Sequence, residues 1–367
     1  MRAIRLLLFF LMSLTAAATE HLIYLGTYTR STSKGIHVVR LDTRTGALGQ
    51  PTLAAATANP SFLALSPDGS HLYAVSESST MAVPFAIDPA TGGLTPLQSQ
   101  DAGGKAPCHL VVDHTERTLV LAHYHSGIVA ALPIRADGTL DAPATVIQHA
   151  GRSVHPTRQE APHVHSVTLS PDNRFVIVCD LGLDRVLTYA LDPATAKLTP
   201  AAIPFVATAP GAGPRHAAFS ADGRHVLVIN ELDSTLVSYR YDAASGALTP
   251  ADRQSTLPAG WTGESTTAEV RIHPNGRFVY GSNRGHDSIA SFAFDAATGK
   301  LTPRGHTPTR GKNPRNFALS PDGAWLVAAN QNSDNLRVFR VDAVSGELTA
   351  LPGEATVPMP VCVLFAR

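Results

Sequence analysis

Four polar side chains capable of catalysis flank a short apolar hairpin in the segment 213–231, GPRHAAFSADGRHVLVINE. Arg215 and His216 precede its first apolar run, and Asn230 and Glu231 follow the second. A guanidinium group can hold an anion or offset charge on a carbonyl oxygen. An imidazole or a carboxylate can accept a proton. The cluster therefore indicates a site, provided that other segments bring similar groups to the same place.

Two antiparallel strands are expected to position this cluster. The apolar runs 217–220 and 225–229 favour strands, and Ser-Ala-Asp-Gly at 220–223 is typical of a tight turn with Gly223 at positive φ. In an antiparallel hairpin the start of the first strand and the end of the second strand lie at the same end. Arg215 and Glu231 are therefore expected to be neighbours.

The hairpin recurs along the chain, and the number of repeats predicts the fold. A phrase of the form D-x-x-T/S-G-x-L-T-P appears seven times, with its leucine at Leu48, Leu94, Leu140, Leu198, Leu248, Leu301 and Leu348. A Ser-Pro-Asp-Gly-type turn appears six times, beginning at Ser66, His114, Ser170, Ser220, His273 and Ser320. A unit of about 50 residues with two hairpin turns holds four strands, and seven such units predict an all-β, seven-bladed β-propeller with four antiparallel strands per blade.

The first unit lacks the Ser-Pro-Asp-Gly-type turn, because the fold begins directly with a strand at 21–28. We expect the segment 361–366, which follows the seventh unit, to supply the missing inner strand and to close the ring. No helix is expected. The longest interval between units contains a polar, proline-containing loop at 149–161, which is expected to overhang one face.

Aligning the units brings further ionisable residues to the cluster. The starts of the inner strands carry Ser61, His109, His165, Arg215, Ala268 followed by Glu269, and Arg315. The ends of the second strands carry Ser76-Glu77, Tyr124-His125, Asp180, Asn230-Glu231, Asn283-Arg284 and Asn330-Gln331. Both rows should face one mouth of the central channel, which is the expected place for a site in a large all-β scaffold.

The candidate residues have more than one interpretation. His163 and His165 share one side of a strand and could serve as a general base, as metal ligands or as polar residues bonded to loop carbonyls. Arg215 and Arg284 could clamp an anion, or they could form interblade salt bridges with Glu231 or Asp180. We predict His165, Glu231, Arg215 and Arg284 as catalytic residues. The predicted substrate-binding residues are His163, His109, His216, Glu269, Arg315 and Asn316.

Neither a metal nor a cofactor is expected. The histidines lack the compact third and fourth ligand of a zinc or iron site, and there is no Cys-x-x-Cys pattern. Cys108, Cys179 and Cys362 are widely spaced, so they do not predict a disulfide framework, although one disulfide is compatible with export.

Charge and the N-terminus suggest an exported protein that binds a small molecule. The 367 residues carry 29 basic and 29 acidic side chains, which argues against nucleic-acid or membrane binding. Arg2 and Arg5 precede the apolar run 6–14 and three alanines at 16–18, a pattern that predicts a signal peptide over 1–18 and a single propeller domain over 19–367. We expect a monomer in the periplasm or outside the cell.

The motifs APHVHSVTLSPD, DLGLDRV, GPRHAAFSADG, HPNGRFVYGSNRGHDSI and GKNPRNFALSPDGAWLVAANQNSDNL resemble the seven-bladed propeller lactonases. That family includes the propeller-type 6-phosphogluconolactonases and the fungal carboxy-muconate cycloisomerases, and the resemblance extends from Ile23 to the last unit. In the muconate enzymes the proposed site holds a histidine, two arginines and a glutamate. By motif position these fall on His165 or His163, Arg215, Glu231 and Arg284.

The resemblance implies hydrolysis of a sugar-type or acidic lactone by water, with no metal. The expected small-molecule partner is an anionic lactone or a sugar acid. The two arginines would hold the substrate, and His165 or Glu231 would be the base. There is no G-x-S-x-G motif for an acyl-enzyme route. The phosphogluconolactonases act on a phosphorylated substrate in the cytoplasm. An exported protein would not meet that substrate, so the predicted export argues against a phosphorylated lactone. Two alternatives are a muconate-type cycloisomerase and an exported propeller that binds without catalysis.

Overall fold

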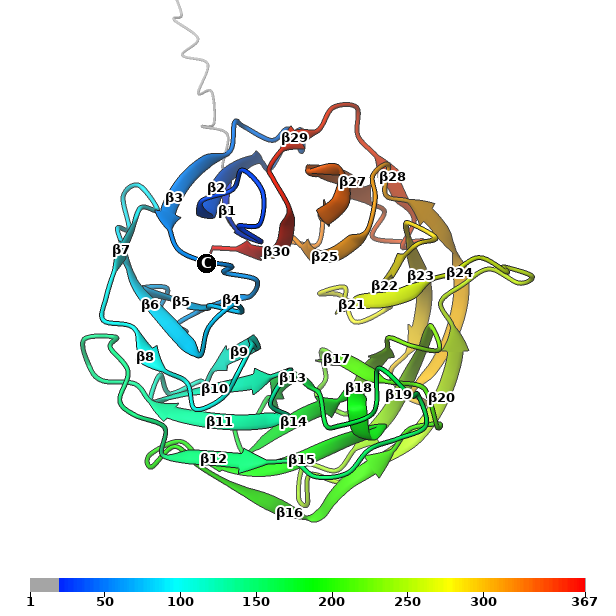
Figure 1. Cartoon of the computed structure of the whole chain (residues 1–367). Helices are drawn as coiled ribbons and strands as arrows, with labels where there is room; N and C mark the ends of the chain where they lie inside the picture. Colours follow the sequence, from blue (N-terminus) through cyan, green and yellow to red (C-terminus); the bar gives the residue numbers. More distant parts are fainter. Residues whose placement is uncertain (1–19, 367) are drawn as a thin grey trace, which may run out of the picture.

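Seven sheets radiate from a central axis in the computed structural model, which describes residues 20–366 (Figure 1). Five sheets have four strands and two have five, and every strand pair within them is antiparallel. The predicted seven-bladed β-propeller is therefore confirmed. The predicted signal peptide lies outside the described residues.

The blades follow one another around the ring in chain order. Blade 1 contains β1 (Glu20–Thr27), β2 (Gly35–Asp42), β3 (Thr52–Ala56) and β30 (Pro360–Phe365). Blade 2 contains β4 (Leu63–Leu65), β5 (His71–Val75), β6 (Met81–Ile87), β7 (Leu94–Pro96) and β8 (Gln100–Asp101). Blade 3 contains β9 (Pro107–Val112), β10 (Thr118–His123), β11 (Ile128–Pro133) and β12 (Thr145–Gln148). Blade 4 contains β13 (Val164–Leu169), β14 (Phe175–Asp180), β15 (Arg185–Asp192) and β16 (Lys197–Ala207).

The remaining three blades repeat the pattern. Blade 5 contains β17 (Pro214–Phe219), β18 (His225–Asn230), β19 (Thr235–Tyr241) and β20 (Leu248–Ser255). Blade 6 contains β21 (Thr266–Ile272), β22 (Phe278–Arg284), β23 (Ser288–Asp295) and β24 (Lys300–Pro308). Blade 7 contains β25 (Pro314–Leu319), β26 (Trp325–Asn330), β27 (Asn335–Val341), β28 (Leu348–Ala350) and β29 (Ala355–Thr356). Within the described residues the helical segments are two single 3₁₀ turns, η1 (Leu181–Leu183) and η2 (Gln331–Ser333).

The C-terminal strand closes the ring, as the sequence predicts. β30 is the innermost strand of blade 1 and pairs with β1, with Tyr24 opposite Leu364 and Gly26 opposite Cys362 (Figure 1). This pairing satisfies the inner edge of β1, which would otherwise expose a row of backbone donors and acceptors. The two ends of the chain therefore hold the same sheet together.

The Ser-x-Asp-Gly turns form by local hydrogen bonding. In blade 5 the Ser220 hydroxyl donates to Asp222 at 2.6 Å, and Gly223 adopts a φ of +70°, which suits a residue without a Cβ. Side chains from neighbouring blades pack between the sheets, as Ile229 of β18 does with Val279 and Phe292 of blade 6. This packing fixes the angle between adjacent blades and so fixes which inner-strand residues meet at the axis.

A β-bulge interrupts the inner strand of six blades at the same level of the channel. The register shifts between Pro214 and His216 in β17, and the equivalent shifts occur in β9, β13, β21, β25 and β30. Because a bulge places an extra residue in one strand, it redirects the side chains on either side of it. The bulged residues include His165, Arg215 and Arg315, three of the predicted site residues.

The structure also shows the state of the cysteines and the character of the helical segments. Cys108, Cys179 and Cys362 are all buried and unpaired, so the disulfide left open by the sequence is not formed. Over residues 20–366 no helix is long and apolar enough to cross a membrane.

Candidate functional site

Glu231 lies at the centre of the first cluster, at the end of the channel where the inner strands begin. It follows β18 directly, and its backbone N–H donates to the carbonyl of Gly213 at 2.7 Å. Its own carbonyl accepts from Thr267 of blade 6 at 3.2 Å. Two blades therefore fix the backbone that carries the carboxylate. The side chain is buried, with 4% of its surface exposed.

Three arginines from different segments converge on this carboxylate. Arg215 Nε donates to Glu231 Oε2 at 2.9 Å, and Arg284 Nη2 lies 3.0 Å from the same oxygen. Arg158 Nη2 donates to Oε1 at 2.5 Å. These guanidinium groups outweigh the effect of burial and hold the pKa of Glu231 well below its usual range, so the carboxylate is ionised.

The chain places Arg158 here by inserting the predicted loop over this end of the channel. Three buried contacts anchor that loop to blade 4: His149 Nδ1 to Asp180 at 2.6 Å, Ser153 to Asp184 at 2.5 Å, and Gln159 Nε2 to the carbonyl of Leu181 at 2.8 Å. Arg158 itself remains about a third exposed. The sequence predicts the loop but does not single out Arg158, for which the available signal is the extra length of this repeat.

His165 is the only imidazole close to Glu231 among the described residues. Its Nε2 lies 3.9 Å from Glu231 Oε2, and its Nδ1 is buried without a hydrogen-bond partner. Burial, followed by the charge of Arg215, lowers the pKa of His165 well below the ordinary value, so the ring is neutral. A neutral buried imidazole with an unused nitrogen is suited to accept a proton.

Tyr124 lies against both predicted histidines. Its ring stacks on His163 with centroids 4.5 Å apart and meets the ring of His165 edge to face at 5.4 Å. His163 Nδ1 donates to the carbonyl of Tyr124 at 2.9 Å, which occupies that nitrogen. Arg158 donates to the Tyr124 hydroxyl at 3.3 Å. His163 therefore helps to hold the tyrosine, while His165 faces the carboxylate.

A narrow cavity lies beneath this cluster, within the layer of bulged residues. Its volume of about 10 Å³ is just enough for one water molecule. The lining includes His165, Arg215 and Arg315, together with Ser61, whose buried hydroxyl has no hydrogen-bond partner. Unsatisfied polar atoms of this kind are open positions for a bound water or substrate.

Arg315 differs from the other arginines of this region because it forms no ion pair within 4 Å among the described residues. Its guanidinium lies 5.4 Å from the ring centroid of Tyr28, whose hydroxyl donates to Glu77 at 2.9 Å. The charges of Tyr28 and Glu77 raise the pKa of Arg315 despite its burial. Arg315 is thus a charged group with free donors beside the narrow cavity.

The other predicted residues lie one level further along the channel, around Glu269. His216 Nδ1 lies 3.2 Å from Glu269 Oε2, and the same oxygen accepts from the Asn316 amide and lies 3.4 Å from Arg271. His109 meets the ring of His216 edge to face, with centroids 5.0 Å apart. The structure thus distributes the ten predicted residues over two connected clusters, rather than over one mouth of the channel.

The structure shows no arrangement for a resident metal. Within residues 20–366 no group of three or more His, Cys, Asp or Glu side chains is placed to hold a metal ion. The carboxylates of both clusters are instead paired with guanidinium groups, and Glu269 also contacts the His216 imidazole.

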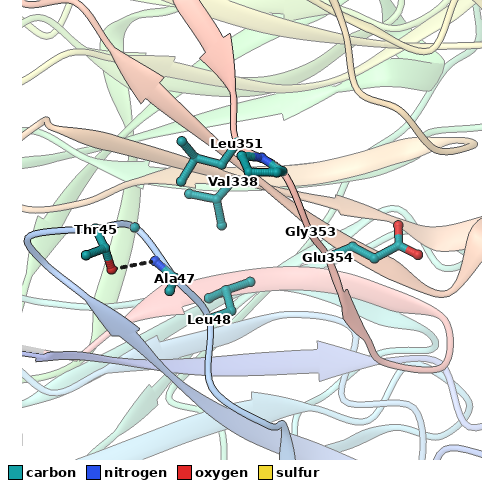
Figure 2. Close-up of a pocket in the computed structure, with 9 residues that line it drawn as sticks. Thr45, Ala47, Leu48, Val338, Leu351, Gly353 and Glu354 are labelled. Carbon is teal, nitrogen blue, oxygen red and sulfur yellow. Dashed lines mark hydrogen bonds between the residues drawn. The ribbon is translucent and has the colours of Figure 1, made fainter.

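A separate cavity, of about 350 Å³, lies away from the channel between blade 1 and blade 7 (Figure 2). Its walls include Leu48, Val338 and Leu351, and Thr45 accepts a hydrogen bond from the backbone of Ala47 at 3.3 Å. Glu354 supplies the one ionisable side chain of its lining and lies 3.3 Å from Arg337. This composition offers no chemistry comparable with that of the channel.

Comparison with known proteins places these features in context. Residues 22–365 match the family model described as "Lactonase, 7-bladed beta-propeller". The chain is 37% identical over 349 residues to a 6-phosphogluconolactonase of Bacillus subtilis, covering 95% of this chain and 99% of the relative. It is 31% identical over 305 residues to a 6-phosphogluconolactonase of Formosa agariphila, covering 81% of this chain and 85% of the relative. The solved structure of a periplasmic gluconolactonase from Pseudomonas aeruginosa superimposes with a TM-score of 0.90 at 35% identity, covering 95% of this chain and 99% of that one.

Proposed function

The chain belongs to the seven-bladed β-propeller lactonase family, and on that premise we propose that it hydrolyses a sugar-type or acidic lactone by direct attack of water without a metal ion. The observation that carries the proposal is the position of His165 beside a carboxylate that three arginines surround. The imidazole is neutral, and its Nδ1 has no hydrogen-bond partner among the described residues. The relatives named as 6-phosphogluconolactonases support the reaction class.

His165 is the general base in this mechanism, and Glu231 is not. A carboxylate whose pKa lies far below its usual range, with three guanidinium groups bound, is a poor proton acceptor at neutral pH. His165 keeps the unpartnered Nδ1 for a water proton, while the charge of Glu231 favours the proton on the Nε2 that faces it. Glu231 therefore orients and stabilises the imidazolium that forms.

The reaction balances with these groups alone. Water gives a proton to His165 as its oxygen attacks the lactone carbonyl, and the arginines offset the charge on the carbonyl oxygen. The ring C–O bond then breaks, and the imidazolium returns its proton to the leaving alkoxide. The product is the open hydroxy acid, and the protein ends in its starting state.

Arg315 is proposed to hold the anionic group of the substrate. Arg215 and Arg284 are already paired with Glu231, whereas Arg315 has no carboxylate within 4 Å and borders the same cavity. A guanidinium fork suits a carboxylate or a phosphate. Because both groups fit, the proposed substrates include acidic lactones beside neutral sugar lactones, and the phosphorylated form is one of the acidic ones.

We further propose that the protein acts as a monomer outside the cytoplasm. The charged and apolar pattern of residues 1–18 supports export, as does the likeness to a periplasmic gluconolactonase. Expression of the full chain, with cell fractionation and N-terminal sequencing, tests this: a mature N-terminus near residue 19 is expected. An intact Met1 on the cytoplasmic protein would contradict export.

The decisive experiment is lactone hydrolysis by the purified protein. We expect turnover of δ-gluconolactone and 6-phosphogluconolactone, measured by acid release, at rates unchanged by a chelator. Muconate-type acids assayed in parallel address cycloisomerisation. No acid release above the spontaneous rate would contradict the lactonase, and loss of activity with chelator would contradict the metal-independent route.

A further inference from the structure

A second and larger chamber lies at the opposite end of the channel, beside the Ser-x-Asp-Gly-type turns. Its volume is about 490 Å³, and its lining runs along the inner strands toward Pro67, His114 and Phe365. Phe62 and His216 line both this chamber and the narrow cavity. The layer of bulged residues therefore separates two spaces, and the lactonase mechanism uses only one of them.

Polar and apolar side chains share the lining of this chamber, which includes both Arg271 and Glu269. Six blades each contribute one residue at an equivalent position of the inner strand: Leu364, Ala64, Val111, Thr168, Ala218 and Arg271. Five of these are uncharged, and Arg271 alone carries a charge. A guanidinium group whose donors are only partly used within the protein can bind a ligand of opposite charge.

Arg271 has only part of its donor capacity occupied. Its Nη2 lies 3.4 Å from Glu269, and its Nε donates to the carbonyl of Phe317 at 3.4 Å. Nη1 has no partner among the described residues, and 37% of the side chain is exposed. By contrast, both carboxylate oxygens of Glu269 already accept hydrogen bonds. Its Oε1 accepts from the backbone of Val270, and its Oε2 accepts from His216 and Asn316.

His109 supplies a second free donor at the base of the chamber. The backbone N–H of Val167 points at His109 Nδ1, 3.5 Å away, so the proton of this imidazole is on Nε2. That N–H has no acceptor among the described residues. The ring lies against Phe62 with centroids 3.9 Å apart, which fixes its orientation. The lining of the chamber thus offers an imidazole N–H and a guanidinium group beside apolar side chains such as Ala64, Val111 and Leu364.

The charge of the channel favours an anion over a cation. The channel as a whole holds more guanidinium groups than carboxylates: Arg158, Arg215, Arg271, Arg284 and Arg315 against Glu77, Glu231 and Glu269. The lining of the chamber itself holds one of each, Arg271 and Glu269. Field lines in a narrow channel of low dielectric reinforce this excess.

From these observations we propose that the turn-end chamber is a second binding site, which takes a small organic acid. The carboxylate of the ligand meets Arg271 and the Nε2–H of His109. Its apolar part lies along Ala64, Val111, Ala218 and Leu364. The proposal does not depend on the lactonase reaction, because none of these residues takes part in it.

Hexanoate and its neutral analogue 1-hexanol are the probes, titrated into the full-length protein by calorimetry. We expect saturable binding of hexanoate with a Kd of about 1 mM or lower and much weaker binding of hexanol. Arg271→Met should weaken hexanoate binding about tenfold or more, since a charge-assisted contact is lost. Ala218→Phe keeps the guanidinium group of Arg271, but its larger side chain occupies space in the chamber. This variant should therefore abolish hexanoate binding.

Two control variants separate this chamber from other positive sites. Arg304→Met removes an exposed arginine of β24, and Arg315→Met removes the unpaired cation at the Glu231 end. Both should bind hexanoate as the wild type does, and a melting curve checks the folding of every variant. Absence of hexanoate binding, equal binding of hexanol, or unchanged affinity in folded Arg271→Met or Ala218→Phe protein would overturn the proposal. Loss of hexanoate binding in Arg315→Met alone would also overturn the proposal.

Discussion

Arg215 and His216 are consecutive residues, yet Arg215 Nη1 lies 3.1 Å from His216 Nε2. In a regular strand, neighbouring side chains point to opposite faces, and the bulge in β17 removes that constraint. An arginine cannot accept a hydrogen bond, so His216 Nε2 must be the acceptor and its proton must be on Nδ1, facing Glu269. The same Nη1 also donates to the carbonyl of Ala268 at 2.5 Å, and Nε donates to Glu231. Among residues 20–366, Nη2 of Arg215 has no hydrogen-bond partner.

His216→Ala should reduce kcat about 10- to 100-fold with little change in KM, because Arg215 loses the acceptor that fixes its orientation. His216→Gln offers an amide oxygen in its place and should recover part of the loss. Steady-state kinetics on folded protein provide the measurement. Equal rates in the wild type and His216→Ala would show that Arg215 is held by Glu231 and Ala268 alone.

The stability of the protein should fall as the pH drops below about 6.5. Burial lowers the pKa of His216 to about 4, whereas an unfolded histidine titrates near 6.5. The folded state therefore binds fewer protons, so the full stability is present above pH 6.5 and is lost as the pH falls toward 4. For His216 alone this amounts to about 3 kcal/mol.

Urea unfolding at pH 7.5 and pH 5 measures this effect. The pKa values of His109 and His165 are also lowered by burial and act in the same direction. His216→Gln should show a smaller loss between the two pH values, whereas His114→Gln, at an exposed position, should behave like the wild type. Stability that rises on acidification would contradict the assignment of neutral buried imidazoles.

Glu231→Gln should reduce kcat at least about 100-fold, because the charge that stabilises the imidazolium and orients Arg215 is removed. It should also lower the free energy of unfolding by about 3–5 kcal/mol, since the guanidinium of Arg215 is left buried without its ion-pair partner. The double variant Glu231→Gln, Arg215→Met should regain stability but not activity. Glu264→Gln, on the exposed loop before β21, is the matched control.

His165→Asn should reduce kcat about 100-fold or more, through loss of the base. In the wild type the lowered pKa of His165 keeps the base unprotonated, so kcat/KM should stay level from neutral pH down to below 6.5 and then fall. A pH–rate profile with its acidic limb at or above 7 would contradict a buried neutral base. Retention of the wild-type rate in folded His165→Asn protein would remove His165 from the mechanism.

Arg315→Met should raise KM for an acidic lactone about tenfold or more and leave KM for a neutral lactone nearly unchanged. The reason is that this cation has no carboxylate within 4 Å among residues 20–366 and so is available to the substrate. Lys312→Met removes a nearby exposed cation paired with Asp287 and serves as the control. An equal rise in KM for the acidic and the neutral lactone would indicate a structural role for Arg315.

Much of the architecture could be read from local patterns. The turn phrases and their spacing predict seven four-stranded units, because each turn depends on short-range hydrogen bonds such as that of Ser220 with Asp222. The missing first turn likewise predicts closure by the last strand, observed as β30. Antiparallel pairing places Arg215 near Glu231, and these two groups are 2.9 Å apart.

The composition of the site required the tertiary structure. Arg158 approaches Glu231 from a loop 73 residues away, and Arg284 comes from the next blade. No local pattern encodes either contact, because it depends on how blades pack and how the loop is anchored. The bulges likewise separated His109, His216, Glu269 and Asn316 from the Glu231 cluster, since one extra residue in a strand changes which way its side chains point. The sequence by itself determined the strands, the turns, the number of blades and the types of reactive group; the closed ring decided which of those groups meet, because contacts across the axis arise only when all seven sheets are in place.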